Sequence, residues 1–196
     1  MEKKKERLAV FIDGSNFYHS TKNITQKGYE IDFKKIIDEL SRGREVKTFY
    51  YTALLDPDYD LEKYEKHKKL LDDLRKIPKF SVVLCDLRKI KIGKKVKYEI
   101  KGDDIHLAHD LLMGAFDNLY DTAIIVSGDA DFIPIINTLK KRFGKKIGNC
   151  YFRRTSSFKL RRACDFSINM NMVIGKLLEK ENRKRPASSK DNASRL

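Results

Sequence analysis

The sequence predicts a single α/β domain with a mainly parallel central sheet flanked by helices. Short apolar runs of strand length alternate along the chain with longer segments whose apolar residues have helical spacing. The runs from Leu8 to Ile12 and from Thr122 to Val126 are apolar throughout, which is typical of strands buried on both faces. A chain of 196 residues with 41% hydrophobic residues is long enough to bury one core of this kind.

In the first half of the chain, three patterns define the expected elements. Apolar or β-branched runs predict strands, and apolar residues three and four positions apart predict helices. Basic and apolar residues alternate around Gly93, which predicts an inserted basic β-hairpin. The first strand ends at Asp13 and is expected to open into a loop. The expected elements are strands at residues 7–12, 45–55 and 80–85, helices at 32–40 and 59–77, and the hairpin at 88–100.

The second half of the chain continues the alternation of strands and helices. Its clearest helix begins at Asp103, with an expected buried face that starts at Ile105. Residues 181–196 are polar and rich in charged residues, Ser and Asn, so we expect one domain over residues 1–180 followed by a disordered basic tail. The remaining expected elements are strands at 122–126 and 145–152 and helices at 103–119, from about 132, at 156–163 and at 170–180.

The composition excludes several classes of protein. No apolar run approaches the ~18 residues that a membrane-spanning helix needs. The basic N-terminus is followed by only a short apolar run before Asp13, which argues against a signal peptide. Three cysteines without CxxC spacing argue against a disulfide framework or a zinc site, so a cytoplasmic location is expected. The net charge of +14 favours an anionic partner, nucleic acid first.

Acidic residues follow two of the predicted core strands. Asp13 follows the first strand, and Asp129 and Asp131 follow the strand that ends at Val126. Because ligands of parallel sheets bind outside the carboxyl ends of the strands, we expect these side chains to converge at one rim. Carboxylates held close together repel unless a cation compensates them, and Mg²⁺ or Mn²⁺ suits oxygen ligands. Helix capping by Asp129 or Asp131 is the alternative interpretation.

A second acidic group lies on the helix that begins at Asp103. Asp104 is at the helix N-terminus, beside Lys101, where a bound ligand would be within reach. The alternative is that Asp104 only interacts favourably with the helix dipole. Asp110 lies on the polar side of the same helix, where a solvated face is the simpler interpretation.

Three ordered motifs resemble those of a known family. They are Ile12-Asp13-Gly14-Ser15-Asn16, the segment from Lys101 to Leu112, and Ser127-Gly128-Asp129-Ala130-Asp131-Phe132. They resemble the signatures of the NYN domain, in the LabA-like branch of the PIN-like nuclease superfamily. The resemblance implies a PIN-like, Rossmannoid sheet whose acidic rim binds Mg²⁺ or Mn²⁺ for RNA cleavage. By position, it implies functional roles for Asp13, Asn16, Asp104, Asp110, Asp129 and Asp131. The sequence departs from the family at Asp103, where an apolar residue is usual.

The leading hypothesis is a metal-dependent ribonuclease that hydrolyses phosphodiester bonds of single-stranded RNA, with RNA expected over DNA as the partner. Asp13, Asp104, Asp129 and Asp131, with Asp110, would hold the metal, and Asn16 would position phosphate or the attacking water. Exposed bases make single-stranded RNA the favoured substrate. The basic residues expected to contact the substrate backbone are Arg88, Lys94, Lys95, Lys101, Arg153, Arg154 and Arg161.

Two other functions remain open at the level of sequence. One is an RNA-binding or regulatory domain that keeps the fold but cleaves too slowly to matter. The other is a metal-dependent phosphatase, because such enzymes also place Asp after parallel strands. The dehalogenase type of phosphatase needs a second Asp two residues after the first, and this position is Ser15. The hairpin or the helix from Tyr59 would serve a homodimer, although no pattern requires one.

Overall fold

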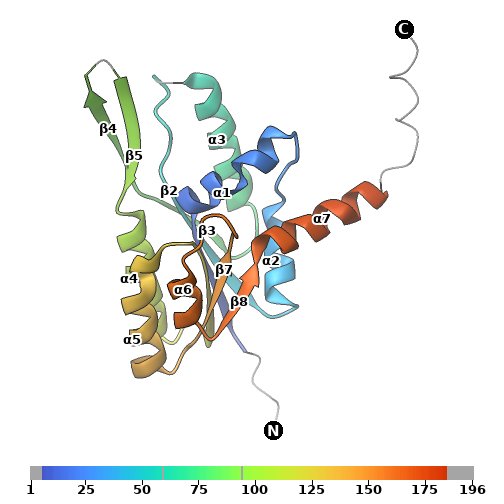
Figure 1. The fold of residues 1–196 in the computed structure, drawn as a ribbon, viewed down its shortest axis with the longest axis vertical. Coiled ribbons are helices and arrows are strands. Elements are labelled where there is room, and N and C mark those ends of the chain that lie inside the picture. The colour runs from blue at the N-terminus through green and yellow to red at the C-terminus, as the bar shows by residue number, and fades with distance from the viewer. Residues whose placement is uncertain (1–5, 59, 94, 185–196) are drawn as a thin grey trace.

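The sheet is fully parallel and doubly wound. The structure, a computed structural model, describes residues 6–58, 60–93 and 95–184. Six strands lie in the order β3-β2-β1-β6-β7-β8, and every adjacent pair is parallel (Figure 1). The strand order reverses between β1 and β6, which makes this pair the topological switch point. The strands are β1 (Leu8–Asp13), β2 (Val46–Thr52), β3 (Phe80–Leu84), β6 (Thr122–Val126), β7 (Lys146–Tyr151) and β8 (Phe166–Asn169).

Helices cover both faces of the sheet because alternate residues of each strand point to opposite sides. On one side, Val10 and Ile12 of β1 join a core built with α1, α2, α3 and α7. On the other, Ala9 and Phe11 pack against α4, α5 and α6. The helices are α1 (Gly14–Gln26), α2 (Phe33–Ser41), α3 (Leu61–Arg75), α4 (Asp103–Phe116), α5 (Ile133–Phe143), α6 (Phe158–Ala163) and α7 (Met170–Lys184), with a 3₁₀ turn, η1 (Ala130–Phe132), before α5.

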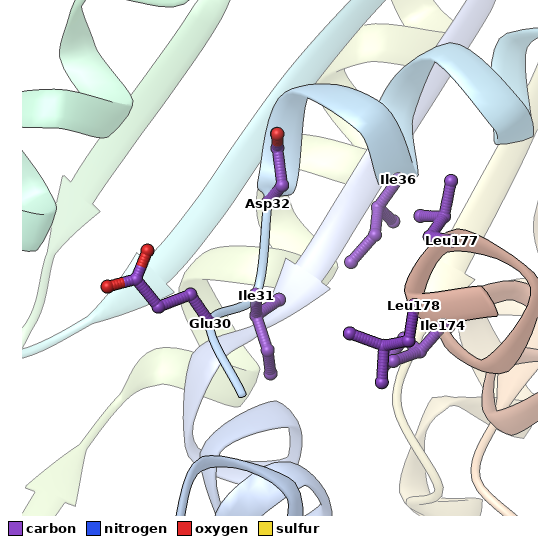
Figure 2. Close-up of a pocket in the computed structure, with 7 residues that line it drawn as sticks. All are labelled: Glu30, Ile31, Asp32, Ile36, Ile174, Leu177 and Leu178. Atoms are coloured by element: carbon purple, nitrogen blue, oxygen red, sulfur yellow. The ribbon is translucent and has the colours of Figure 1, made fainter. Parts of the chain in front are cut away.

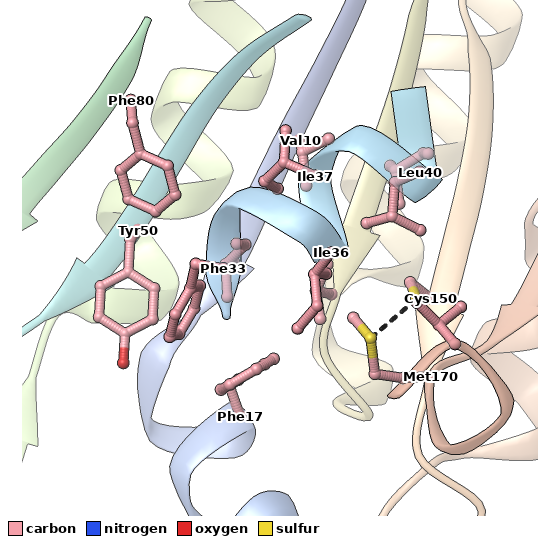
Figure 3. Packing of buried hydrophobic residues seen from close by; sticks show 14 of the residues in the cluster. Val10, Phe17, Phe33, Ile36, Ile37, Leu40, Tyr50, Phe80, Cys150 and Met170 are labelled. Carbon is pink, nitrogen blue, oxygen red and sulfur yellow. Dashed lines mark hydrogen bonds between the residues drawn. The ribbon is translucent and has the colours of Figure 1, made fainter. Parts of the chain in front are cut away.

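The first core contains a group of aromatic rings that meet edge to face or at a tilt. Phe33 lies at its centre, with its ring 5.0 Å from that of Phe17 and 5.5 Å from that of Tyr50 (Figure 3). Farther along the sheet, the buried Cys150 lies 4.0 Å from the sulfur of Met170. This packing fixes α1 on the sheet, and the site begins at the N-terminus of α1.

The last helix covers the end of this core. In α7, Ile174, Leu177 and Leu178 face Ile31, just before α2, and Ile36 of α2 (Figure 2). The helix runs to Lys184, so residues 181–184 are helical where the sequence predicts the beginning of a tail. The remainder of that predicted tail lies outside the described residues. Among the helices that the structure describes, none has the length and apolar character needed to cross a membrane.

The basic hairpin is confirmed and forms a separate two-stranded sheet. Strands β4 (Asp86–Ile92) and β5 (Lys95–Lys101) pair in antiparallel fashion. The hairpin projects beyond the carboxyl ends of the main strands and leads directly into α4 (Figure 1). The insertion therefore brings its base to the rim where the acidic motifs end.

Three local expectations differ from the structure. Residues 14–26 form helix α1 rather than a loop, because the Asp13 side chain accepts the Asn16 backbone N–H and caps the helix. Strand β8, only four residues long, is not expected from the sequence. The expected buried position of Ile105 in α4 is wrong, since its side chain is 70% exposed and Leu107 is buried instead.

The end of the sheet opposite the site is held by an ion pair between Arg7 and Asp121. The Arg7 backbone N–H and its guanidinium donate to the Asp121 carboxylate at 2.7–3.1 Å. The hydrogen bonds from the Arg7 side chain hold the pKa of Asp121 down to about 2. The pair joins the start of β1 to the start of β6, on either side of the switch point.

We expect Asp121→Asn to lower the free energy of unfolding by about 1 kcal/mol at pH 7, since the pair is partly exposed. A depressed pKa stabilises the folded state above the ordinary value near 3.8, and this contribution is lost as the pH falls toward 2. Urea titrations of both proteins between pH 7 and pH 2 measure the difference. A difference that persists unchanged at pH 2 would contradict the assignment.

Candidate active site

The site begins with Asp13, whose position is fixed by strand β1 and helix α1. It is the last residue of β1, paired with Tyr51 of β2, and it also caps α1. One carboxylate oxygen accepts the Asn16 backbone N–H at 2.9 Å. The other accepts the Ser127 hydroxyl at 2.9 Å. The strand and the helix therefore hold this carboxylate in a single orientation.

Ser127 connects the ends of β1 and β6. Its hydroxyl donates to Asp13 and accepts the Asp129 backbone N–H at 3.1 Å. The fully buried Asn149 of β7 donates to the carbonyls of Ile125 and Ser127 at 3.1 and 2.9 Å and so holds the end of β6 in place. Ser127 therefore links the Asp13 carboxylate to the backbone at Asp129.

A cleft of about 420 Å³ opens at this rim. Its walls come from four places: the end of β1 with the start of α1, the loop after β6, the loop after β7, and the base of the hairpin with the start of α4. Twelve residues line it: Asp13, Ser15, Asn16, His19, Glu99, Ile100, Lys101, Gly102, Asp103, Asp104, Asp129 and Thr155. The fold thus brings acidic side chains from three separate segments around one space.

The electrostatics of the cleft disfavour negative charge at its deepest acids. Burial raises the pKa of Asp13, and the charges of Asp103 and Asp129 raise it further, against the lowering effect of its two hydrogen bonds. Burial likewise raises the pKa of Asp103, with a further contribution from Asp104. A bound cation would reverse this effect, because it stabilises the ionised carboxylates.

The donor set of the cleft suits a hard divalent cation. Its acidic side chains offer carboxylate oxygens only, as Mg²⁺ and Mn²⁺ prefer. Within the part of the chain that the structure describes, no three His, Cys, Asp or Glu side chains are already gathered closely enough to enclose a metal ion. The residues present fit a cation because their donors are carboxylate oxygens and because their negative charges are unfavourable without one.

The structure brings most, but not all, of the acidic residues named from the sequence to the cleft. Asp13, Asp104 and Asp129 line it, and Asn16 does so with its backbone N–H committed to Asp13. Asp131 is exposed and does not line the cleft; its N–H donates to Asp129 at 2.9 Å.

Asp110 also lies outside the cleft lining. It accepts the Tyr51 hydroxyl at 3.0 Å, and His109 lies at the same distance from its other oxygen. Because Tyr51 is paired with Asp13 in the sheet, Asp110 is linked to the site through that tyrosine.

The basic residues named from the sequence are divided among three locations. Lys101 lines the cleft, and Arg88 is exposed on the hairpin. Arg153 and Arg154 are exposed on the loop that also carries Thr155. The Arg161 guanidinium lies 4.6 Å from the centre of the Tyr151 ring and donates to Ser156, so it is held against the protein. Lys94 lies outside the described residues, and only the backbone of Lys95 is described.

Several cleft residues were not predicted from the sequence. Asp103 is half-buried and its charge raises the pKa of Asp13, whereas the sequence named Asp104 at this helix terminus. Ser15 and His19 are four residues apart on one face of α1, so a helix prediction for this segment would have found His19. No local signal marks Thr155, which reaches the cleft only through the loop after β7 and bonds to Ser20 of α1 at 2.7 Å.

The fold and the site together define a Rossmann-like α/β domain with an acidic cleft at its switch point. The chain belongs to the NYN domain family, whose model matches residues 7–171. The NYN domain is a family of PIN-like nucleases, so the chain is a member of a nuclease family with nucleic acid as its class of substrate. The expected NYN domain and the expected fold class are both confirmed, and the LabA-like branch stays a prediction.

A solved structure shows the same fold. It is the crystal structure of a protein of unknown function, VPA0982, from Vibrio parahaemolyticus RIMD 2210633. The two chains are 24% identical, with a TM-score of 0.64 over 86% of this chain and 95% of the other. No curated protein matches the chain significantly.

Proposed function

We propose that this protein is a metal-dependent ribonuclease that hydrolyses phosphodiester bonds of single-stranded RNA in the rim cleft. The observation that carries the proposal is the convergence of Asp13, Asp103 and Asp129 from three segments at the switch point. Burial of Asp13 and Asp103, together with repulsion from the neighbouring carboxylates, leaves the site in need of positive charge. Membership of a nuclease family supplies the class of reaction.

Asp13, Asp103, Asp104 and Asp129 would hold Mg²⁺ or Mn²⁺ by their carboxylate oxygens. When bound, the metal would activate water and stabilise the charge of the leaving oxygen. Ser127 orients Asp13 and, through its second hydrogen bond, the backbone at Asp129. Lys101 places a positive charge in the cleft wall, where it would contact a phosphate. Asp110 and Asp131 do not line the cleft, so they would act on the metal site through their contacts with Tyr51 and Asp129.

The direct test is cleavage of end-labelled single-stranded RNA by the purified chain with Mg²⁺, with Mn²⁺ or with EDTA. We expect cleavage that requires the metal and leaves a 5′-phosphate and a 3′-hydroxyl. A matched single-stranded DNA shows whether the 2′-hydroxyl contributes. Absence of cleavage with either metal would contradict the proposal.

The second candidate function is an RNA-binding module that does not cleave. The observation in its favour is that the described residues include no preformed group of three metal-binding side chains. Binding of RNA in EDTA at the same affinity as in Mn²⁺, together with no cleavage, would support this function.

The two acids at the start of α4 differ in burial, and this predicts a difference between their variants. We expect Asp103→Asn to reduce cleavage by on the order of 10²-fold or more, because Asp103 is half-buried and interacts with Asp13. Asp104 is exposed, so Asp104→Asn is expected to reduce cleavage by on the order of tenfold. Metal titrations of the cleavage rate compare the two, and a larger effect at Asp104 would reverse the assignment.

A further inference from the structure

The hairpin has two chemically different faces, and its register shows which residues share each one. In an antiparallel pair, residues directly opposite each other lie on the same face, and alternate residues along a strand return to that face. Arg88 is opposite Glu99, and Asp86 is opposite Lys101. Lys97 is two residues from Glu99 and therefore lies on this same face.

This face is the one directed toward the site. Two residues of this face, Glu99 and Lys101, line the rim cleft, against one of the opposite face, Ile100. The Lys101 ammonium lies 3.2 Å from the Glu99 carboxylate. Lys97 continues the row of β5 side chains away from the cleft, Arg88 lies beside Glu99 on β4, and both are exposed. We call the row of Lys101, Glu99, Arg88 and Lys97 the cleft face of the hairpin.

The opposite face is engaged by another part of the fold. Tyr98 donates its hydroxyl to Asp56, in the segment after β2, at 2.6 Å. Lys89, paired with Tyr98, lies 3.7 Å from the same carboxylate. Lys91 is on this second face, since it is two residues from Lys89. The contacts with Asp56 hold the hairpin in a defined orientation, with its cleft face over the site.

We propose that the cleft face of the hairpin binds the sugar–phosphate backbone of a single RNA strand as it leaves the acidic cleft. This inference rests on the proposed function and adds the path of the substrate. Residues 86–101 contain seven basic and two acidic residues, so the hairpin attracts a polyanion that the acidic cleft alone would repel. Lys101 and Arg88 lie near the cleft, where the strand would leave it, and Lys97 lies farther along the hairpin.

The dimensions suit a short stretch of backbone. From Lys101 to Lys97, four residues of strand span about 13 Å. That distance corresponds to about four nucleotides of a stacked strand, at about 3.4 Å each. The cleft face of the hairpin therefore extends the substrate-binding surface beyond the cleft. RNA strands long enough to reach it are expected to bind more tightly than strands that fill the cleft alone.

The cleft face of the hairpin also carries two acidic residues, Asp86 opposite Lys101 and Glu99 opposite Arg88, and of these Glu99 lines the cleft. It draws the Lys101 ammonium toward itself and adds a negative charge where a phosphate would pass. The proposal therefore predicts that removing this charge strengthens binding, an effect opposite in sign to that of removing a cation.

The test measures binding in EDTA, so that neither metal nor cleavage contributes. The probe is a fluorescein-labelled single-stranded RNA of about 12 nucleotides, and its polarisation is followed over a range of salt concentrations. Lys97→Ala and Arg88→Ala are each expected to weaken binding about three- to tenfold. Each should also reduce the slope of log affinity against log salt by about 0.7. Glu99→Gln is expected to strengthen binding severalfold.

The matched control is Lys91→Ala, which removes the same charge from the other face. We expect it to change the affinity less than twofold. Equal losses at Lys91 and Lys97, or no loss at either, would overturn the proposal, as would weaker binding by Glu99→Gln. The cleavage assay tests the nuclease proposal independently. A chain that binds RNA with this face preference but does not cleave it would support the proposed path on the hairpin and contradict the nuclease proposal.

Discussion

We expect Asp13→Asn to reduce metal-dependent RNA cleavage by on the order of 10²–10³-fold while the chain stays folded. Asp13 is the carboxylate that lies at the switch point itself, and it accepts hydrogen bonds from both Asn16 and Ser127. Asparagine keeps a carbonyl oxygen to cap α1 but loses the negative charge that a divalent cation requires. The cleavage rate in saturating Mn²⁺ is the measurement.

The matched control for this variant is Asp117→Asn, which makes the same chemical change outside the cleft. Asp117 is exposed at the C-terminal end of α4, and its backbone N–H closes that helix. We expect full cleavage by this variant. Undiminished cleavage by a folded Asp13→Asn protein would place the chemistry elsewhere.

When no metal is present, we expect Asp13→Asn to stabilise the folded chain rather than weaken it. Because the folded protein raises the pKa of Asp13, it keeps a proton that the unfolded chain has already lost at the same pH. The stability contributed by this group therefore falls as the pH rises through the interval between the ordinary value of 3.8 and the raised one. Above this interval the charge is unfavourable in the fold.

Thermal unfolding in EDTA at pH 7 is thus expected to give a higher melting temperature for Asp13→Asn than for the natural chain. For a chain of this size, about 1 kcal/mol corresponds to about 2–4 °C. Added Mn²⁺ should stabilise the natural chain by mass action and have little effect on the variant. If the variant is less stable than the natural chain in EDTA and is stabilised equally by Mn²⁺, the Asp13 charge is not unfavourable in the fold and Asp13 is not a metal ligand.

The second large effect is expected at Gly128, from sterics alone. A Cβ atom at this position would lie 1.9 Å from the carbonyl oxygen of Thr155 and 2.7 Å from its carbonyl carbon. The loop after β7 approaches so closely because the Ser157 N–H donates to the Gly128 carbonyl at 3.0 Å. Both neighbouring atoms belong to the backbone, so no side-chain rotation relieves the overlap.

We expect Gly128→Ala to lower the free energy of unfolding by about 1–3 kcal/mol, because the loop must move to admit the methyl group. Since this loop carries Thr155, the same movement opens one wall of the cleft and lowers cleavage in the fraction that stays folded. Urea unfolding at pH 7 and the cleavage rate at a temperature well below the transition measure the two effects.

Gly175→Ala is the matched control for this substitution. Gly175 lies within α7, and a Cβ built there meets no described atom within 4 Å apart from its chain neighbours and the nearby backbone of its own helix. Alanine favours a helix over glycine by up to about 1 kcal/mol, so this variant is expected to be as stable as the natural chain or more so. If Gly128→Ala matches Gly175→Ala in stability, the loops after β6 and β7 separate without a cost in the free energy of unfolding.

The sequence by itself determined the fold class, the basic hairpin and three of the acids that line the cleft. These features are local: the apolar runs of β1 and β6 predict buried strands, and parallel strands place Asp13 and Asp129 at the same rim. The alternation around Gly93 is equally local, and it predicted the hairpin to within two residues.

Only the tertiary structure decided which side chains share the site. Asp131, two residues from Asp129, lies outside the cleft lining because the 3₁₀ turn directs the chain away. Thr155 and Glu99 reach the cleft from distant parts of the sequence, and the hairpin register separates Lys97 from Lys91. These assignments depend on contacts between segments far apart in the chain, and such contacts leave no periodic pattern in the sequence.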